Sequence, residues 1–347
     1  MTRKDSHRKI CIVPESQSGG PGSFLRRFKR GVEERGFTTT HDLTDDRIDS
    51  ILVINATRRL SRLLHHRKRG VRIVQRLGSP ASLHPFLPTT WRDTVLAYVR
   101  ACMVRWVRAR CADALVYQSR FVKSEWERLH GMIPLPCTVI YNGIDIEGFG
   151  AVKDRYQSPR KHCLISVEGN QGNDPFDIAL HLAERLRARG LDFELLMFGN
   201  PLYDIEERAA HNPSIRFMGS ISPEKLPFYY AGADCYILTD IIGAGCPNSV
   251  IESLACGTPV LGYDLGVISE MLDPYSGILV KGAGDPWKGQ SPGNFDLLAE
   301  AALGICNNRD TYRKGAQRIA DERYGLDRMV DNYLEMLFPA GYEGAPF

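Results

Sequence analysis

The stretch "CPNSVIESLACGTPVLGYDLGVISEML" (residues 246–272) predicts a helix, a buried strand and the start of a second helix. Asn248 or Ser249 offers a side-chain oxygen that can cap the first helix, and Gly257 fits the position just past its end. The apolar run 259–264 is typical of a strand buried in a parallel sheet. Two helix N-termini would then lie at one sheet edge, where free N–H groups and helix dipoles favour an anion such as a diphosphate.

Glu252 lies inside the first of these helices and admits two interpretations. With Ser249 as the N-cap, the Glu252 carboxylate can reach back to the cap N–H, as in a capping box. Alternatively, a carboxylate at this position can accept hydrogen bonds from two neighbouring hydroxyls of a ligand. The local sequence favours the cap, and only the surrounding motifs favour a ligand.

The composition limits the class of protein. Of 347 residues, 43% are hydrophobic and 24% charged, which is ordinary for a globular chain of two domains. There is no apolar run of about 18 residues to cross a membrane, and the polar beginning lacks the apolar core of a secretory signal. Nine scattered cysteines without a CxxC pair predict reduced thiols in a cytoplasmic protein, with Cys163 and Cys235 in buried strands.

Charge is distributed unevenly along the chain. Residues 1–150 carry 26 Lys and Arg against 14 Asp and Glu, a net of +12, whereas residues 151–347 carry 18 against 27, a net of −9. Such a break predicts two domains with a boundary near residue 150. Short apolar strands alternate with amphipathic helices in both halves, and this pattern predicts an α/β fold of two Rossmann-like, doubly wound domains. The tail after residue 294 is predicted to be helical.

Three segments resemble retaining glycosyltransferases of family four, which have the GT-B fold. They are "PNSVIESLACGTPVLGYDLGVISEML", "ADALVYQSRFVKSEW" followed by "TVIYNGIDIEGF", and "PESQSGGPGSFLRRFKRGVEERGF". The resemblance implies two domains facing a central cleft: an acceptor-binding domain (1–150), a nucleotide-sugar-binding domain (151–325), and a last helix (326–347) that packs back on the first. It also implies transfer of a sugar from a nucleotide diphosphate sugar with retention of configuration.

The resemblance also implies site residues. Glu252 matches the residue that binds the donor ribose, Gly266–Glu270 matches the loop that meets the donor phosphates or sugar, and Asn142 belongs to a turn near the hinge. The implied donor-binding set is Gly19, Gly20, Asn142, Gly169, Asn170, Asn248, Ser249, Glu252, Gly266, Val267, Ser269 and Glu270. No metal or other cofactor is expected, because helix N-termini and side chains would stabilise the leaving diphosphate.

Two departures from the family pattern matter. Ala244 stands where the family has a glutamate that touches the donor sugar. The segment "SVEGNQGNDPF" (166–176) carries Glu168 and no cation, where the family has an arginine and a lysine that neutralise the diphosphate. The cations would then come from the first domain, and Arg76 and Lys123 are the catalytic candidates, with Arg120 nearby. These departures leave open a protein that binds nucleotide sugars without catalysis.

Other functional classes have less support. A dinucleotide-binding oxidoreductase would need G-x-G-x-x-G after the first strand, and here Leu25 stands at the last glycine position, although Asp42 lies about where a ribose-binding acid belongs. No serine hydrolase or metalloprotease motif is present.

The basic first half has three interpretations: solvated helix faces, nucleic-acid binding without a supporting motif, or docking of a cytoplasmic protein to the anionic inner face of a membrane. The acceptor is an unknown saccharide, lipid-linked or small-molecule compound; with docking to a membrane a lipid-linked acceptor would fit, as in polysaccharide or glycolipid biosynthesis.

Overall fold

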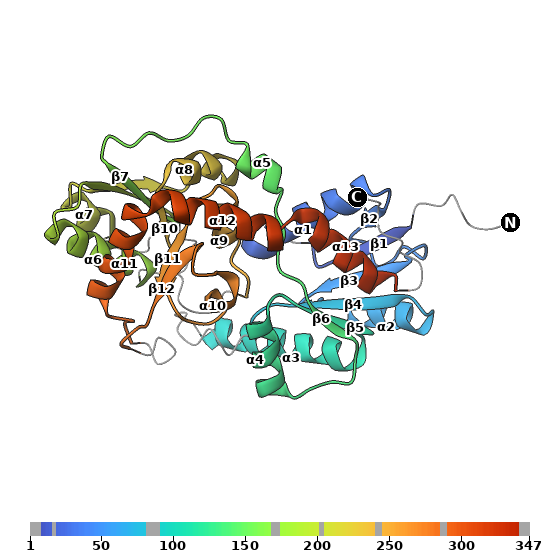
Figure 1. Cartoon of the computed structure of the whole chain (residues 1–347). Coiled ribbons are helices and arrows are strands. Elements are labelled where there is room, and N and C mark those ends of the chain that lie inside the picture. The colour runs from blue at the N-terminus through green and yellow to red at the C-terminus, as the bar shows by residue number, and fades with distance from the viewer. Residues whose placement is uncertain are drawn as a thin grey trace. The chain divides into compact units, whose positions relative to one another are not determined.

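The chain folds into two compact units in this computed structural model (Figure 1). The structure describes residues 8–15, 19–80, 91–167, 174–200, 205–239, 245–284 and 290–339. Unit 1 contains the described residues up to Gly143 together with those from Leu326 onward, and unit 2 contains Ile144–Gly325. Each unit is a parallel six-stranded sheet with helices on both faces, so the predicted pair of doubly wound Rossmann-like domains is confirmed.

The sheet of unit 1 has the strand order β2-β1-β3-β4-β5-β6, and every described pair is parallel. Its elements are β1 (Lys9–Val13), α1 (Gly19–Glu34), β2 (Thr38–Thr40), β3 (Ser50–Ile54), α2 (Leu60–Lys68), β4 (Arg72–Leu77), α3 (Trp91–Arg110), β5 (Ala114–Tyr117), α4 (Arg120–His130), β6 (Cys137–Val139) and α13 (Leu326–Leu337).

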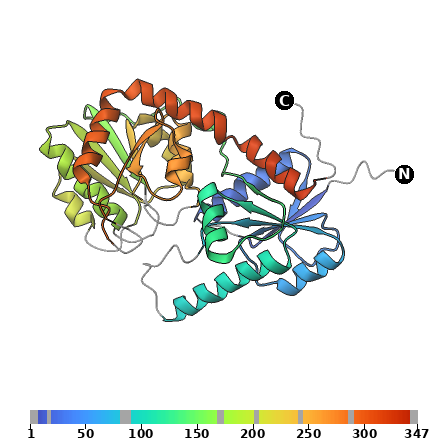
Figure 2. The ribbon, with the colours of Figure 1, turned by 60° about the horizontal axis from the view of Figure 1, so that its bottom comes forward.

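Alternation along the strands divides the core of unit 1 between the two faces of its sheet. Ile10 and Ile12 of β1 pack with α1 and α13, whereas Cys11 and Val13 pack with α2 and α3 on the other face. Gly31 allows α1 to approach α13 closely, because a Cβ at Gly31 would lie 2.5 Å from a methyl of Val330. Figure 2 shows α2 and α3 together in the layer opposite α13.

The sheet of unit 2 has the order β12-β11-β10-β7-β8-β9, the 3-2-1-4-5-6 arrangement of dinucleotide-binding Rossmann folds. Its elements are α5 (Ile146–Gly150), β7 (His162–Val167), α6 (Asp174–Ala188), β8 (Phe193–Phe198), α7 (Ile205–Ala210), β9 (Ile215–Gly219), η2 (Pro223–Lys225), α8 (Leu226–Gly232), β10 (Cys235–Ile237), α9 (Asn248–Ala255), β11 (Val260–Tyr263), α10 (Ile268–Met271), β12 (Gly277–Val280), α11 (Phe295–Asn307) and α12 (Arg309–Arg323).

The break between the units differs from the position near residue 150 that the charge distribution predicts. The chain enters unit 2 at Ile144, because α5 already packs on α9 and α12. Ile144 donates its N–H to the Tyr324 carbonyl at 2.8 Å, so the two connections to unit 1 leave unit 2 from adjacent positions. The charge break reflects surface residues, whereas the boundary at Ile144 is set by the packing of the core.

Candidate functional site

The strand order of unit 2 reverses between β7 and β10, which are direct neighbours through Tyr236 and Ile165. In open parallel sheets, ligands bind outside the carboxyl ends of the strands at such a switch point. The chain leaves β7 at Val167 and β10 at Ile237. Residues 168–173 and 240–244 follow these two ends, so the predicted Gly169 and Asn170, and Ala244, lie outside the described residues.

Helix α9 begins at this edge and differs from its predicted start. Asn248 is its first residue and Pro247 is the N-cap, without a side-chain hydrogen bond at the cap. The prediction that Asn248 or Ser249 caps the helix is therefore wrong. The Ser249 hydroxyl instead accepts a hydrogen bond from Tyr236 at 3.0 Å. That bond joins β10 to the first turn of α9.

Glu252 is the fifth residue of α9, two residues beyond the position from which a capping box reaches back to the N-cap, so the capping-box interpretation is also wrong. Six of the eight residues of α9 are buried, and Glu252 keeps 9% of its surface exposed. Burial, followed by the charge of Glu252, raises the pKa of Cys256 to about 12. Because α9 begins at Asn248, Glu252 has no capping role, and its role in ligand binding stays a prediction.

The loop 266–270 follows β11 along the same edge. Helix α10 is a single turn that begins at Ile268, with Val267 as its N-cap. Gly266 has φ +61°, which favours glycine. Two side chains at the end of α12 hydrogen-bond to this turn. Arg323, the last residue of α12, donates to the Glu270 carbonyl at 3.3 Å, and Tyr324, which follows it, donates to the Met271 carbonyl at 2.7 Å. Sequence reasoning missed both supports, which lie about 50 residues away along the chain.

The glycine-loop candidates Gly19 and Gly20 are the first two residues of α1 in unit 1 and are exposed. Lys123 lies on α4, half-buried, and its ammonium pairs with Glu127 at 3.9 Å. The structure gives no contact that joins Lys123 to Arg76, the other catalytic candidate, within the described residues of unit 1.

Arg76 is 1% exposed and lies in the core of unit 1. Its guanidinium stacks over the Phe24 ring at 3.9 Å and donates to Asn142 Oδ1 at 2.8 Å. With the Gln118 amide turned so that its oxygen faces the guanidinium, that oxygen accepts from both terminal nitrogens at 2.7 and 3.1 Å. Arg76 therefore positions the start of α1 against the turn at Asn142, and its catalytic role stays a prediction.

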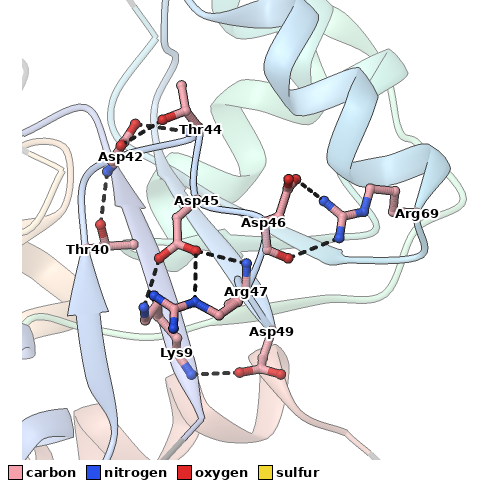
Figure 3. Close-up of polar contacts among 9 residues, drawn as sticks. All are labelled: Lys9, Thr40, Asp42, Thr44, Asp45, Asp46, Arg47, Asp49 and Arg69. Atoms are coloured by element: carbon pink, nitrogen blue, oxygen red, sulfur yellow. Dashed lines mark hydrogen bonds and ion pairs between the residues drawn. The ribbon is translucent and has the colours of Figure 1, made fainter.

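The loop 41–49, between β2 and β3, carries the acid of the oxidoreductase alternative (Figure 3). The Asp42 carboxylate accepts from the Thr44 N–H at 2.9 Å and from its hydroxyl at 2.7 Å, and these bonds hold the pKa of Asp42 below its usual value. Asp42 also lies 3.7 Å from Arg59. Both oxygens are thus engaged in shaping the loop.

All nine cysteines are free, and Cys163 and Cys235 are buried in strands as predicted. Within the described ranges, no three His, Cys, Asp or Glu side chains gather into a group that could hold a metal ion. No described helix is long and apolar enough to span a bilayer.

Comparisons with known proteins agree with the fold. Residues 164–288 match the family model "Glycosyl transferases group 1". An uncharacterized glycosyltransferase of Methanocaldococcus jannaschii is 21% identical over 207 residues, which cover 56% of this chain and 50% of that relative. The chain thus spans about half the length of the curated relative it matches.

Two solved structures illustrate the GT-B fold. Sucrose-phosphate synthase from Thermosynechococcus elongatus has a TM-score of 0.70 at 15% identity, covering 96% of this chain and 100% of the other. Anabaena HepE in complex with UDP and glucose has a TM-score of 0.67 at 15% identity, with the same coverage of both chains. These likenesses establish a shared two-domain α/β fold.

Proposed function

We propose that the chain is a glycosyltransferase that moves a sugar from a nucleotide diphosphate sugar to an acceptor with retention of configuration. One observation carries the proposal. The matched family segment, residues 164–288, contains the switch-point edge of unit 2, with the start of α9, Glu252 and the loop 266–270. Retention rests on the family-four resemblance alone.

Each part of this edge has a chemical task in the proposal. The Glu252 carboxylate would accept hydrogen bonds from the two ribose hydroxyls. Backbone N–H groups in the first turn of α9 and in the loop 266–270 would meet the diphosphate, whose negative charge the helix dipole favours. They would also stabilise the leaving diphosphate without a metal ion. UDP is the first nucleotide to test, since the solved HepE structures contain UDP or UDP-glucose.

A protein that binds nucleotide sugars without turning them over is the second candidate. It is favoured by Ala244 and by the acidic segment 166–176, which replace the family's sugar-binding glutamate and diphosphate-neutralising cations. Arg76 is buried and Lys123 is paired with Glu127, so a substrate would have to displace contacts to recruit either.

Thermal unfolding with a panel of nucleoside diphosphates, nucleotide sugars and NAD(P) tests the proposal. A ligand at 100 times its dissociation constant stabilises the folded state by about 2.7 kcal/mol. We expect a nucleoside diphosphate to raise the melting temperature. Stabilisation by NAD(P) alone would support the oxidoreductase instead. Slow hydrolysis of the stabilising donor without acceptor identifies the enzyme, and binding with no turnover across an acceptor screen identifies the non-catalytic protein.

The acceptor is proposed to bind unit 1. If the acceptor is lipid-linked, the protein would be cytoplasmic and would associate peripherally with the inner face of a membrane to reach it. The excess of cations in the first half of the chain supports this, because anionic lipid attracts clustered Lys and Arg.

A further inference from the structure

Helix α3 exposes large apolar side chains in its first half. Trp91 is 73% exposed and Tyr98 is 66% exposed, and Val95, Leu96 and Val99 are also exposed. Only the second half of α3 packs on the sheet, through Val107 and its neighbours. In Figure 2 the first half extends past the sheet of unit 1. An exposed apolar patch of this kind marks a site of contact with another protein, a membrane or a ligand.

These side chains form one stripe on the helix. At 3.6 residues per turn, or about 100° per residue, Trp91, Val95, Tyr98 and Val99 fall within an arc of about 100°. We call these four residues the α3 stripe. The core-facing positions of the same helix, Val104 and Val107, lie roughly on the opposite side. Trp106, within the same arc of the helix, packs partly on the core beside Val107. The stripe is open to solvent because it lies in the first half of α3, where residues 91, 92 and 94–100 are all exposed.

The borders of the stripe are basic. Arg92 follows Val99 around the helix on one side, and Arg105 follows Tyr98 on the other. Asp93 is the only acidic residue in the sequence of α3. Both arginines are exposed. An apolar face with aromatic residues and flanking arginines is typical of a helix that lies in the plane of a membrane interface.

Helix α2 adds cations to the same layer, because α2 and α3 cover one face of the sheet. The six basic residues at α2 are not equivalent. Arg59, Arg67 and Arg69 pair with Asp42, Asp113 and Asp46. Arg58, Arg62 and Lys68 are exposed and form no ion pair with any described residue. The unneutralised charge of this layer is therefore positive.

We propose that the α3 stripe, Arg92 and Arg105, with Arg58, Arg62 and Lys68 of the α2 region, form a docking surface for an anionic lipid bilayer. The stripe would enter the interface and the cations would contact lipid headgroups. A second copy of the chain fits less well, since two such surfaces would bring arginines of like charge together. This surface rests on the proposed function, because it is where unit 1 would meet a lipid-linked acceptor. Binding to lipid can nevertheless be measured without the nucleotide-sugar donor.

Sedimentation with vesicles tests the surface. The whole protein should bind phosphatidylcholine vesicles that contain phosphatidylglycerol, and not phosphatidylcholine alone. Arg92→Glu/Arg105→Glu should weaken binding at least about tenfold, since each cation contributes near an anionic surface. Trp91→Ser/Tyr98→Ser should weaken it about tenfold or more through lost apolar burial. Tyr275→Ser removes an aromatic side chain of unit 2 that is 60% exposed. This variant is the control and should bind as the wild type does.

Fluorescence separates insertion from surface adsorption. Brominated lipids should quench the tryptophan emission of the wild type more than that of Trp91→Phe. The proposal is overturned if anionic vesicles do not bind at low salt, if both α3 variants bind like the control, or if RNA or a second copy of the chain occupies the surface instead. UDP binding, measured on the same samples, tests the proposed function separately: lost lipid binding with intact UDP binding rejects the docking surface only.

Discussion

Tyr236 donates its hydroxyl to the Ser249 hydroxyl at 3.0 Å, linking β10 to the first turn of α9. The two residues lie on either side of the segment 240–244, which follows β10 at the switch point. The bond holds the first turn of α9 against β10. Glu252 lies one turn further along the same helix, so the position of its carboxylate relative to β10 depends on this bond. This bond matters at the helix start because Pro247 supplies no capping side chain.

Tyr236→Phe should weaken donor binding without unfolding the protein. Loss of one neutral hydrogen bond costs about 1 kcal/mol of stability, and a looser α9 should lower affinity for a nucleoside diphosphate several-fold. Calorimetric titration gives the affinity. Tyr156→Phe is the matched control, since it removes a hydroxyl bond to Glu194 at 2.8 Å on another part of unit 2. Equal losses of affinity in both variants would contradict the role of the Tyr236 bond.

Glu252→Gln should lower affinity for the nucleoside diphosphate by roughly tenfold or more, because a charge-assisted hydrogen bond contributes ~1.5–3 kcal/mol. Glutamine is similar in size, so α9 should keep its packing. Calorimetry with the free diphosphate measures the effect, and Glu300→Gln, an exposed change on α11, serves as the control. Unchanged affinity in a folded Glu252→Gln protein would remove Glu252 from the site.

The sequence predicted the strands and helices well because their apolar periodicity reflects burial in a sheet. Val250, Ile251, Leu254 and Ala255 are buried as expected, and Gly257 has the predicted positive φ, +75°. Helix starts were harder to predict, because several adjacent residues compete for one cap and tertiary contacts decide among them. Ser249 shows this, since a bond from Tyr236 takes its hydroxyl.

The role of Arg76 and the exposure of the apolar side chains of α3 could not be predicted from the local sequence. Arg76 occupies a strand position that alternation alone could not distinguish from a strand-end cation, yet it is buried over Phe24. Similarly, the order of apolar residues in α3 does not tell whether they face a core or solvent, and the structure shows that Trp91 and Tyr98 are exposed. In both cases long-range packing, which periodicity does not contain, decides the role of the side chain.

Arg76→Met should destabilise unit 1 locally by about 3 kcal/mol, because the buried Asn142 oxygen and the half-buried Gln118 oxygen both lose a charged donor. Hydrogen exchange in β4 and β5 measures this local stability. Arg76→Lys should lose less, although a lysine cannot reproduce the forked contact. If Arg76→Met leaves exchange unchanged but abolishes donor hydrolysis, Arg76 is a catalytic residue and its structural role is wrong.

Thiol reactivity should separate two cysteines from the other seven. Cys137 is exposed and Cys102 is half-buried, whereas the rest are buried. Burial raises the pKa of Cys163 and of Cys306 to about 12, which keeps these thiols protonated and unreactive at pH 8. Ellman's reagent should therefore titrate Cys137 quickly, Cys102 more slowly, and the others only after unfolding. Rapid reaction in a Cys137→Ser/Cys102→Ser protein would contradict the buried placement of the remaining thiols.

Acid should weaken the loop 41–49 through Asp45. Lys9 donates to its carboxylate at 2.8 Å and the Arg47 N–H at 2.9 Å, and these bonds, the Lys9 bond first, lower the pKa of Asp45 to about 2 (Figure 3). A carboxyl group has a pKa of about 3.9 in the unfolded chain. Since the folded pKa is the lower one, the stabilisation is complete above about pH 4 and disappears as the pH falls towards 2.

Asp45→Asn should therefore lower the melting temperature at pH 7, and the difference from wild type should shrink between about pH 4 and pH 2. Ile48→Val, which removes one methylene group from a buried side chain of the same loop and no ionisable group, should show a difference that depends less on pH over that range. A constant difference between wild type and Asp45→Asn down to pH 2 would mean that the ion pair with Lys9 does not stabilise the fold.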